Sequence, residues 1–225
     1  MDYINKIVQG NCLEVLKGIP DESIDLCLTD PPYGMNYQSS WRIDKHDKII
    51  FDDSIEWFES FAKQLFRIMK NDTHTYIFCN DYAISYFRNW LELAGFVNKR
   101  VLVWVKNNHT SGDLEGDYGN KTEFLLYAHK GKRKLNGKRN TNVLYYSREN
   151  TDNHPTAKPI SLCGFLIEKS SNKSDIVLDP FSGSFTTALA AEMLNRNWIG
   201  IELSPEYCAI GQQRLDIYRQ QLKLF

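Results

Sequence analysis

The stretch "VLDPFSGSFTTALAAEMLNRNWIGIEL", residues 177–203, decides the fold of this chain. An apolar strand ends at Asp179, a turn through Gly183 opens an apolar helix, and a second strand ends at Glu202. In parallel sheets, turns of this kind bind nucleotides at the helix N-terminus. A dinucleotide loop, however, needs a second glycine where this chain has Phe185. The segment therefore predicts either a different cofactor loop or a turn that binds no ligand.

Apolar strands and amphipathic helices alternate along the rest of the chain. We expect strands at residues 5–10, 24–30, 74–80, 98–106, 122–130, 175–179 and 197–203, and helices at 52–71, 81–95, 158–171, 183–195 and 204–222. This alternation predicts an α/β fold with a Rossmann-like, doubly wound and mostly parallel sheet. No internal repeat or linker divides the sequence, so residues 1–225 are expected to form a single domain.

Composition excludes several classes of protein. The chain has 225 residues, of which 42% are hydrophobic and 13% aromatic, which is typical of a globular domain. No apolar run is long enough to span a membrane, and the first residues lack the layout of a signal peptide. The five cysteines are dispersed without CxxC spacing, so we expect no metal site, no disulfides and a reducing cytoplasm. The net charge of −1 confines any nucleic-acid affinity to local patches.

The turn Asp30-Pro31-Pro32-Tyr33 follows a predicted strand, where ligands of such sheets bind. It combines a carboxylate, carbonyl acceptors without competing N–H groups, and an aromatic ring. These groups suit an exocyclic amino group on a flat ring; the alternative is an edge strand that ends in prolines. Glu202 is placed to accept the hydroxyls of a ribose, with a helix cap as the alternative.

Three segments, in this order, resemble the amino-methyltransferases of DNA, which use S-adenosylmethionine to methylate N6 of adenine or N4 of cytosine. Residues 9–34, "QGNCLEVLKGIPDESIDLCLTDPPYG", resemble the catalytic block of that family. Residues 154–159, "HPTAKP", resemble the block beside the cofactor, and residues 177–203 resemble the cofactor loop. The catalytic block comes first, as in the circularly permuted β group of phage and restriction–modification enzymes. The resemblance implies an adenine-specific methyltransferase.

The resemblance also implies roles for single residues. Asp30 and the Pro31 carbonyl would accept the hydrogens of the target amine, and Tyr33 would stack on a base flipped out of the DNA. Asn11 and Cys12 would contact the adenine ring of the cofactor, and Lys158 would suit a carboxylate. The cofactor residues implied are Asn11, Cys12, Asp30, His154, Thr156, Lys158, Asp179, Phe181, Ser182, Gly183, Thr186 and Glu202.

Two features of the sequence depart from these roles or leave them open. The family has glycine at the position of Phe185; we expect Phe185 in the first helical turn with φ below zero and its ring packed away from the cofactor. For His154 the alternative is a cap at the entry to the next helix.

DNA contacts are expected in three insertions, residues 34–52, 107–121 and 130–153, which would rim the same cleft. The segment "KGKRKLNGKR" contains no acid, and its basic residues are Lys130, Lys132, Arg133, Lys134, Lys138 and Arg139. A solvated loop is the alternative interpretation. The expected substrate is duplex DNA, with single-stranded DNA and a shared homodimer left open.

Other reactions remain as alternatives. Asp rather than Ser before the two prolines favours adenine over N4 of cytosine. Amino-methyltransferases of RNA or of protein glutamine also use a Pro-Pro-Tyr turn, although in the glutamine enzymes Asn usually replaces Asp30. Phe185 disfavours a nicotinamide dehydrogenase, and the absence of a Pro-Cys turn disfavours methylation of cytosine carbon 5. A DNA-binding protein without activity would have lost the cofactor site.

Overall fold

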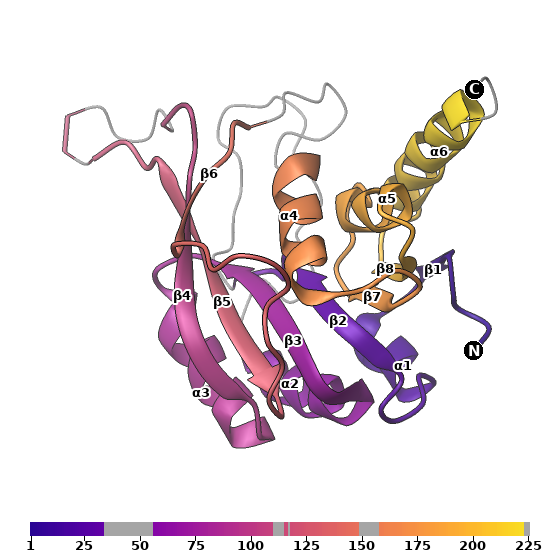
Figure 1. Ribbon diagram of the computed structural model, residues 1–225, viewed down its shortest axis with the longest axis horizontal. Helices are drawn as coiled ribbons and strands as arrows, with labels where there is room; N and C mark the ends of the chain where they lie inside the picture. Colours follow the sequence, from indigo (N-terminus) through magenta and orange to yellow (C-terminus); the bar gives the residue numbers. More distant parts are fainter. Residues whose placement is uncertain (34–55, 110–114, 117, 149–157, 223–225) are drawn as a thin grey trace.

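The computed structural model describes residues 1–33, 56–109, 115–116, 118–148 and 158–222. Its centre is an eight-stranded sheet with the order β1-β8-β7-β2-β3-β5-β4-β6 (Figure 1). The strands are β1 (Lys6–Gln9), β2 (Ile24–Thr29), β3 (Met69–Cys79), β4 (Val97–Val105), β5 (Thr122–Lys130), β6 (Val143–Tyr145), β7 (Ile176–Asp179) and β8 (Asn197–Glu202). The helices are α1 (Cys12–Lys17), α2 (Trp57–Ile68), α3 (Ala83–Ala94), α4 (Ile160–Ser170), α5 (Thr186–Met193) and α6 (Pro205–Leu222).

The sheet is parallel except where β5 pairs with β3 and with β4. All strands but β5 therefore end at the same edge of the sheet, which we call the carboxyl edge. The opposite edge, where β5 ends, is the amino edge. This arrangement confirms the predicted α/β fold with a doubly wound, mostly parallel sheet.

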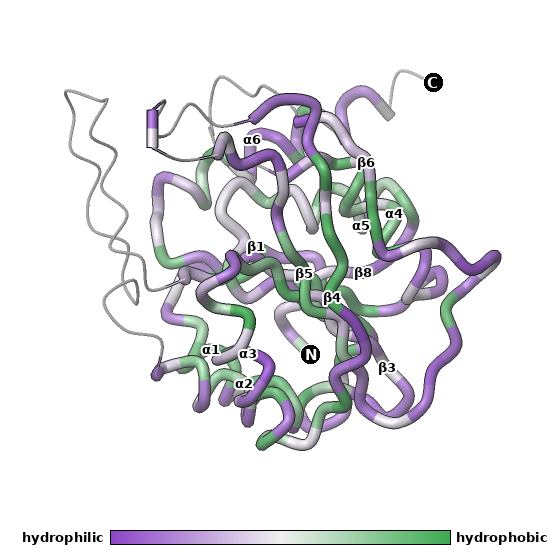
Figure 2. The backbone as a smooth tube through the Cα atoms, turned by 90° about the vertical axis from the view of Figure 1, so that its left-hand side faces the viewer, coloured by the Kyte–Doolittle hydropathy of each residue, from purple (hydrophilic) through white to green (hydrophobic). Residues whose placement is uncertain are grey.

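Helices cover both faces of the sheet and divide the hydrophobic core into two clusters. Helices α1, α2 and α3 pack on one face, and α4, α5 and α6 on the other (Figure 1). Strand β2 is buried along its whole length, as expected for a central strand with both faces covered. Figure 2 shows the same separation along the backbone, with hydrophobic strands inside and hydrophilic connections outside. The core thus holds the strand ends of the carboxyl edge in fixed positions.

Several boundaries differ from those expected. The predicted helix 52–71 ends at Ile68, and β3 begins at once with Met69 instead of His74. Helix α1 and strand β6 were not predicted, because six and three residues are too few to show a period. None of the described helices is long and apolar enough to cross a membrane.

Candidate active site at the carboxyl edge

Two segments that lie 150 positions apart in the sequence meet at the carboxyl edge. Strands β2 and β7 are neighbours, with Cys27 opposite Leu178. The Thr29 hydroxyl donates a hydrogen bond of 2.7 Å to Asp179 Oδ1. Burial raises the pKa of Asp179 to about 7, although the hydrogen bond from Thr29 acts in the opposite direction. The expected catalytic turn and the expected cofactor loop therefore lie side by side.

Asp30 follows β2 directly and binds a different side chain with each carboxylate oxygen. Its Oδ1 accepts a hydrogen bond from the Tyr33 hydroxyl, and its Oδ2 lies 2.6 Å from Lys158 Nζ. The side chain of Asp30 is 31% exposed, so the carboxylate remains accessible from the surface. Burial and the Asp30 carboxylate raise the pKa of Tyr33 above its ordinary value, so the hydroxyl keeps its proton and donates. Pro31 is buried and Pro32 half-buried, which makes the turn rigid.

Behind Asp30, charged side chains form a continuous chain of ion pairs. Lys158 Nζ lies 2.9 Å from Glu123 Oε2, and Lys106 Nζ lies 2.7 Å from Glu123 Oε1. Burial would lower the pKa of Lys158, but the carboxylates of Asp30 and Glu123 outweigh it and raise the pKa above its ordinary value. Burial would likewise raise the pKa of Glu123, but Lys158 and Lys106 hold it below the ordinary value. Lys158 and Glu123 are therefore both charged at neutral pH.

The Glu202 carboxylate organises the expected cofactor loop. One oxygen accepts the Gly183 N–H at 2.7 Å, and the other accepts the Ser204 N–H at 2.9 Å. Gly183 has φ +48°, a conformation that favours glycine. Strand β1 brings Asn11, which caps α1 through the Leu13 N–H, to the same end of β8. Glu202 does not cap α6, because the side chain that accepts a helical N–H there is Ser204 Oγ, from Tyr207 at 3.3 Å. Each Glu202 oxygen keeps a further lone pair, and the ribose role stays a prediction.

Cys12 is a buried thiol beside Glu202. Burial and, to a smaller extent, the Glu202 carboxylate raise the pKa of Cys12 to about 12. The thiol is therefore uncharged at neutral pH and presents an apolar surface. Asn11, Cys12 and Glu202, which are far apart in the sequence, form one group at the carboxyl edge.

The expectation that Phe185 has φ below zero is wrong. Phe185 precedes α5 with φ 62° and ψ 33°, which is the left-handed conformation. Its ring is 1% exposed and lies between Gly200 of β8 and Gly211 of α6. A Cβ at Gly200 or Gly211 would come within 2.5 Å or 2.1 Å of the ring. The two glycines thus make room for the ring inside the core.

The remaining loop residues are fixed from several sides. Ser182 Oγ donates to the Asp179 carbonyl at 2.8 Å, and Thr186 accepts a hydrogen bond of 3.1 Å from Arg214 of α6. Arg214 also donates to the Ser184 carbonyl at 2.6 Å. The half-buried Phe181 ring lies 5.3 Å from the ring of Trp57, which adds an aromatic wall. The loop is therefore held in one conformation by its surroundings.

A protein-family model described as DNA methylase matches residues 24–213, from the start of β2 to within α6. The chain belongs to this DNA methylase family. The type II methyltransferase M.HinfI of Haemophilus influenzae is 31% identical over 252 residues, which cover 95% of this chain and 69% of the relative. The DNA adenine methyltransferase YhdJ of Escherichia coli (strain K12) is 30% identical over 245 residues, which cover 94% of this chain and 82% of the relative.

Solved structures of methyltransferases have the same fold. M1.HpyAVI in complex with SAM superposes with a TM-score of 0.74 at 31% identity, covering 93% of this chain and 98% of that chain. The PvuII DNA methyltransferase, which is cytosine-N4-specific, superposes with a TM-score of 0.77 at 23% identity, covering 93% and 85%. The second likeness concerns the fold alone.

The basic segment of the methylase lies away from the site. Lys130 ends β5 opposite Thr73, at the amino edge. Lys130 is 8% exposed, and its Nζ donates to the Met69 carbonyl at 2.8 Å beyond the end of α2. Asn136 binds the end of α4 through the Lys169 carbonyl at 2.8 Å. The insertion 130–153 was expected to rim the cleft, and for its first part, Lys130 to Asn136, this expectation is wrong. Lys130 stabilises the fold.

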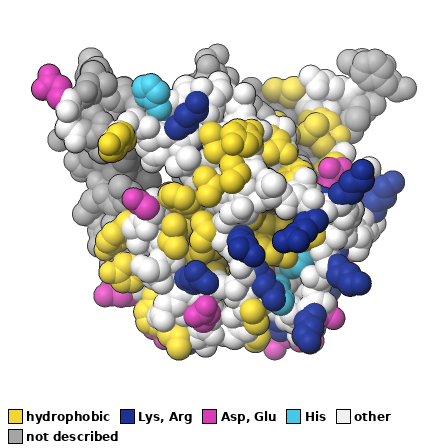
Figure 3. All heavy atoms as spheres, turned by 60° about the vertical axis from the view of Figure 1, so that its left-hand side comes forward, with side chains coloured by type: hydrophobic (Ala, Val, Ile, Leu, Met, Phe, Trp, Pro, Cys, Tyr) yellow, Lys and Arg dark blue, Asp and Glu magenta, His cyan; other side chains and the backbone are white. Residues whose placement is uncertain are grey.

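One face of the DNA methylase carries several Lys and Arg side chains. Figure 3 shows Lys and Arg side chains across the middle and lower part of this face. Among the exposed ones of this segment are Lys132, Lys134, Lys138 and Arg139, while Arg133 is half-buried. Their role in DNA binding stays a prediction.

Some of the expected site residues lie outside the described residues, and two residues of the site were not expected from the sequence. His154 and Thr156 lie outside the described residues, as do residues 34–52 and parts of the other two insertions. No sequence pattern pointed to Lys106, which follows β4, or to Glu123, the second residue of β5. Charged residues near strand ends are common and carry no signal of their own. Only the pairing of β4 with β5 shows that these two side chains lie next to each other.

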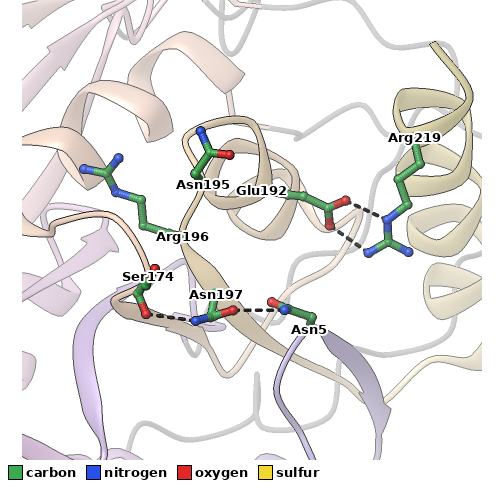
Figure 4. A pocket seen from close by; sticks show the side chains of 7 residues that line it. All are labelled: Asn5, Ser174, Glu192, Asn195, Arg196, Asn197 and Arg219. Carbon is green, nitrogen blue, oxygen red and sulfur yellow. Dashed lines mark hydrogen bonds and ion pairs between the residues drawn. The ribbon is translucent and has the colours of Figure 1, made fainter. Parts of the chain in front are cut away.

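A hollow at the amino edge lies far from this chemistry. Figure 4 shows its lining residues, among them Asn5, Asn197 and the ion pair of Glu192 with Arg219. Arg219 Nε lies 2.6 Å from Glu192 Oε1. Within the described part of the chain, no three His, Cys, Asp or Glu side chains are grouped so that they could hold a metal ion.

Proposed function

We propose that this DNA methyltransferase transfers a methyl group from S-adenosylmethionine to the exocyclic N6 of an adenine that is flipped out of DNA. The observation that carries the proposal is the placement of Asp30 between Tyr33 and Lys158, next to the loop around Asp179. The relative YhdJ is named as a DNA adenine methyltransferase, and M1.HpyAVI was solved with SAM. The first supports the choice of adenine, and the second supports this cofactor.

The residues of the turn supply hydrogen-bond acceptors for the amine. The lone pair of N6 is delocalised into the ring, so the free amine is a poor nucleophile. When the base enters, the Tyr33 hydroxyl leaves Asp30 Oδ1, and its ring stacks on the base. Oδ1 and the Pro31 carbonyl then accept the two amine hydrogens, which localises the lone pair on nitrogen.

The atoms balance in a direct transfer. S-adenosylmethionine supplies a methyl group that is already activated on a sulfonium sulfur. The N6–C bond forms as the C–S bond breaks, and the electron pair remains on sulfur as a neutral thioether. The methylated nitrogen then passes one proton to Asp30, from which it reaches solvent.

The residues at the ends of β1, β7 and β8 fit the cofactor. The free lone pairs of Glu202 are available to ribose hydroxyls, and the uncharged Cys12 suits the flat adenine ring. The Gly183 N–H is taken by the Glu202 carboxylate, which suits a cofactor that has no phosphate. Lys158 is already bound to two protein carboxylates, so the cofactor contact expected for it has less support.

Methyl transfer to defined DNA tests the function. With labelled cofactor and a library of duplex and single-stranded DNA, we expect N6-methyladenine as the labelled nucleoside. Asp30→Asn should lower kcat by about a hundredfold or more, because it removes the anionic acceptor, and should leave cofactor binding by calorimetry unchanged. Labelled N4-methylcytosine would establish the cytosine alternative, and label only in RNA or protein would refute the DNA substrate. A homodimer stays a prediction that sedimentation can check.

A further inference from the structure

Lys106, Glu123 and Lys158 form the series of ion pairs behind Asp30. The proposed mechanism makes no use of this series. Each member comes from a different element: Lys106 follows β4, Glu123 is the second residue of β5, and Lys158 precedes α4. The side chains of Lys106 and Lys158 are only 7% and 12% exposed. Burying three charged groups, wholly or in part, costs free energy of desolvation. We therefore expect these residues to have a role besides that of ordinary surface charges.

The position of Glu123 is set by the sheet. Because β5 runs against β3 and β4, its first residues lie at the carboxyl edge, with Glu123 opposite Trp104. The Lys106 N–H donates to the Lys121 carbonyl at 2.9 Å, which holds the two strand ends together. The Glu123 carboxylate therefore approaches Lys158 from a rigid support and not from a loop.

Lys158 is held between the two carboxylates. Its Nζ lies 2.6 Å from Asp30 Oδ2, 2.9 Å from Glu123 Oε2 and 4.9 Å from the centre of the Phe78 ring. The ammonium therefore has three neighbours in fixed directions. By binding Oδ2, Lys158 fixes the orientation of the Asp30 carboxylate, with Oδ1 on the side of Tyr33.

We propose that Glu123, anchored by Lys106, is a positioning residue for Asp30. It holds the Lys158 ammonium where this group binds Asp30 Oδ2, and so directs Oδ1 towards the target amine. The inference rests on the proposed function, because it assigns the two oxygens of Asp30 to different partners. Glu123 itself does not contact the substrate.

A double-mutant cycle on kcat tests the proposal. Glu123→Gln should lower kcat by about ten- to a hundredfold, the scale of a misplaced reacting group, while the Kd for S-adenosylmethionine stays within about twofold. In a Lys158→Met background, Glu123→Gln should have almost no further effect, because Glu123 acts through Lys158. If the two effects simply multiply, or if Glu123→Gln keeps full kcat, the proposal is wrong.

Glu192→Gln is the matched control. Glu192 is about as exposed as Glu123, at 22% against 27%, and it also forms an ion pair, but at the amino edge (Figure 4). This control should lower the thermal stability without changing kcat. Should Glu123→Gln fail to fold, Glu123→Asp keeps the charge but shortens the side chain, and it should still lower kcat; full kcat in this variant would equally refute the proposal.

Crystal structures separate this inference from the proposed function. If the wild type transfers no methyl group to DNA, the proposed function is wrong, whatever the effect of Glu123→Gln. The contact between Lys158 and Asp30 can be measured in wild type and in Glu123→Gln regardless of substrate. A displaced Asp30 carboxylate supports the positioning role, and an unchanged one refutes it.

Discussion

At position 179 a carboxyl group lies in the core with only 5% of its surface exposed. Because burial raises its pKa from the ordinary 3.8 to about 7, the protonated acid favours the folded state. This stabilisation is complete below the ordinary pKa and is lost as the pH rises to about 7. The charged form of Asp179 therefore destabilises the folded state. The destabilised segment is the loop beside the active site.

We predict that Asp179→Asn changes the pH dependence of stability. The neutral amide does not ionise, so the free energy of unfolding of the variant, relative to wild type, should increase by about 2 kcal/mol between pH 5 and pH 8. Urea unfolding at a series of pH values measures this difference. Parallel curves for the two proteins would show that Asp179 does not titrate in this range.

At the scale of elements, helix α6 and strand β8 enclose the ring of Phe185. Glycine inside a helix normally costs stability relative to alanine, so Gly211 in α6 needs a reason. The reason is the ring, which lies 2.1 Å from where a Cβ would stand. Gly211 thus allows helix α6 to pack directly against the ring of Phe185.

We predict that Gly211→Ala destabilises the protein by about 1–3 kcal/mol, because the methyl group overpacks the core against Phe185. Phe185→Gly should also destabilise it, by about 3 kcal/mol, through the cavity that it leaves. In the Phe185→Gly background, Gly211→Ala should instead be stabilising, because the clash is gone and alanine favours the helix. Chemical denaturation of the four proteins measures these changes.

Binding of S-adenosylmethionine is the companion measurement in the same series. Phe185→Gly should keep the cofactor Kd within about threefold, since the ring is directed into the core. Loss of binding in this variant would show that the ring shapes the cofactor site after all. A destabilising Gly211→Ala in both backgrounds would mean that another neighbour limits the space.

At the scale of the whole molecule, the two edges of the sheet differ in what they carry. The carboxyl edge bears Asp30, Asp179 and Glu202, and β6 brings Tyr145 to the same edge, opposite Val105. Tyr145 is 75% exposed, so its ring is accessible to a base. Lys132 and Lys134 follow β5 at the amino edge.

We predict that DNA binding depends on Tyr145 more than on these lysines. Tyr145→Ala should weaken binding by about 1–3 kcal/mol, the value of one stacking contact with a base. Lys132→Ala combined with Lys134→Ala should change the affinity and its salt dependence much less. Fluorescence anisotropy over a range of salt concentrations compares the two variants. A larger effect of the lysine pair would place the DNA along the amino edge.

Much of the fold could be predicted because it depends on local patterns of apolar and polar residues. The apolar runs at 24–30 and 175–179 and the periodic helices required an α/β sheet, and the turn around Asp30 had few other uses. Short elements such as α1 and β6 could not be predicted, since their stability comes from packing and not from a period. The conformation of Phe185 was missed for a similar reason, because its φ depends on two glycines that come later in the chain.

The sequence by itself determined the class of the protein: the order of its strands and helices, the turn at Asp30 and the cofactor loop at Gly183. These are properties of contiguous segments, in which spacing and residue type suffice. Only the tertiary structure decided which charges meet. The reversed direction of β5 brings Glu123 to Lys106 and Lys158 at the edge where Asp30 lies, and it carries Lys130 to the opposite edge. Strand direction follows from packing over the whole sheet, so no local pattern records it.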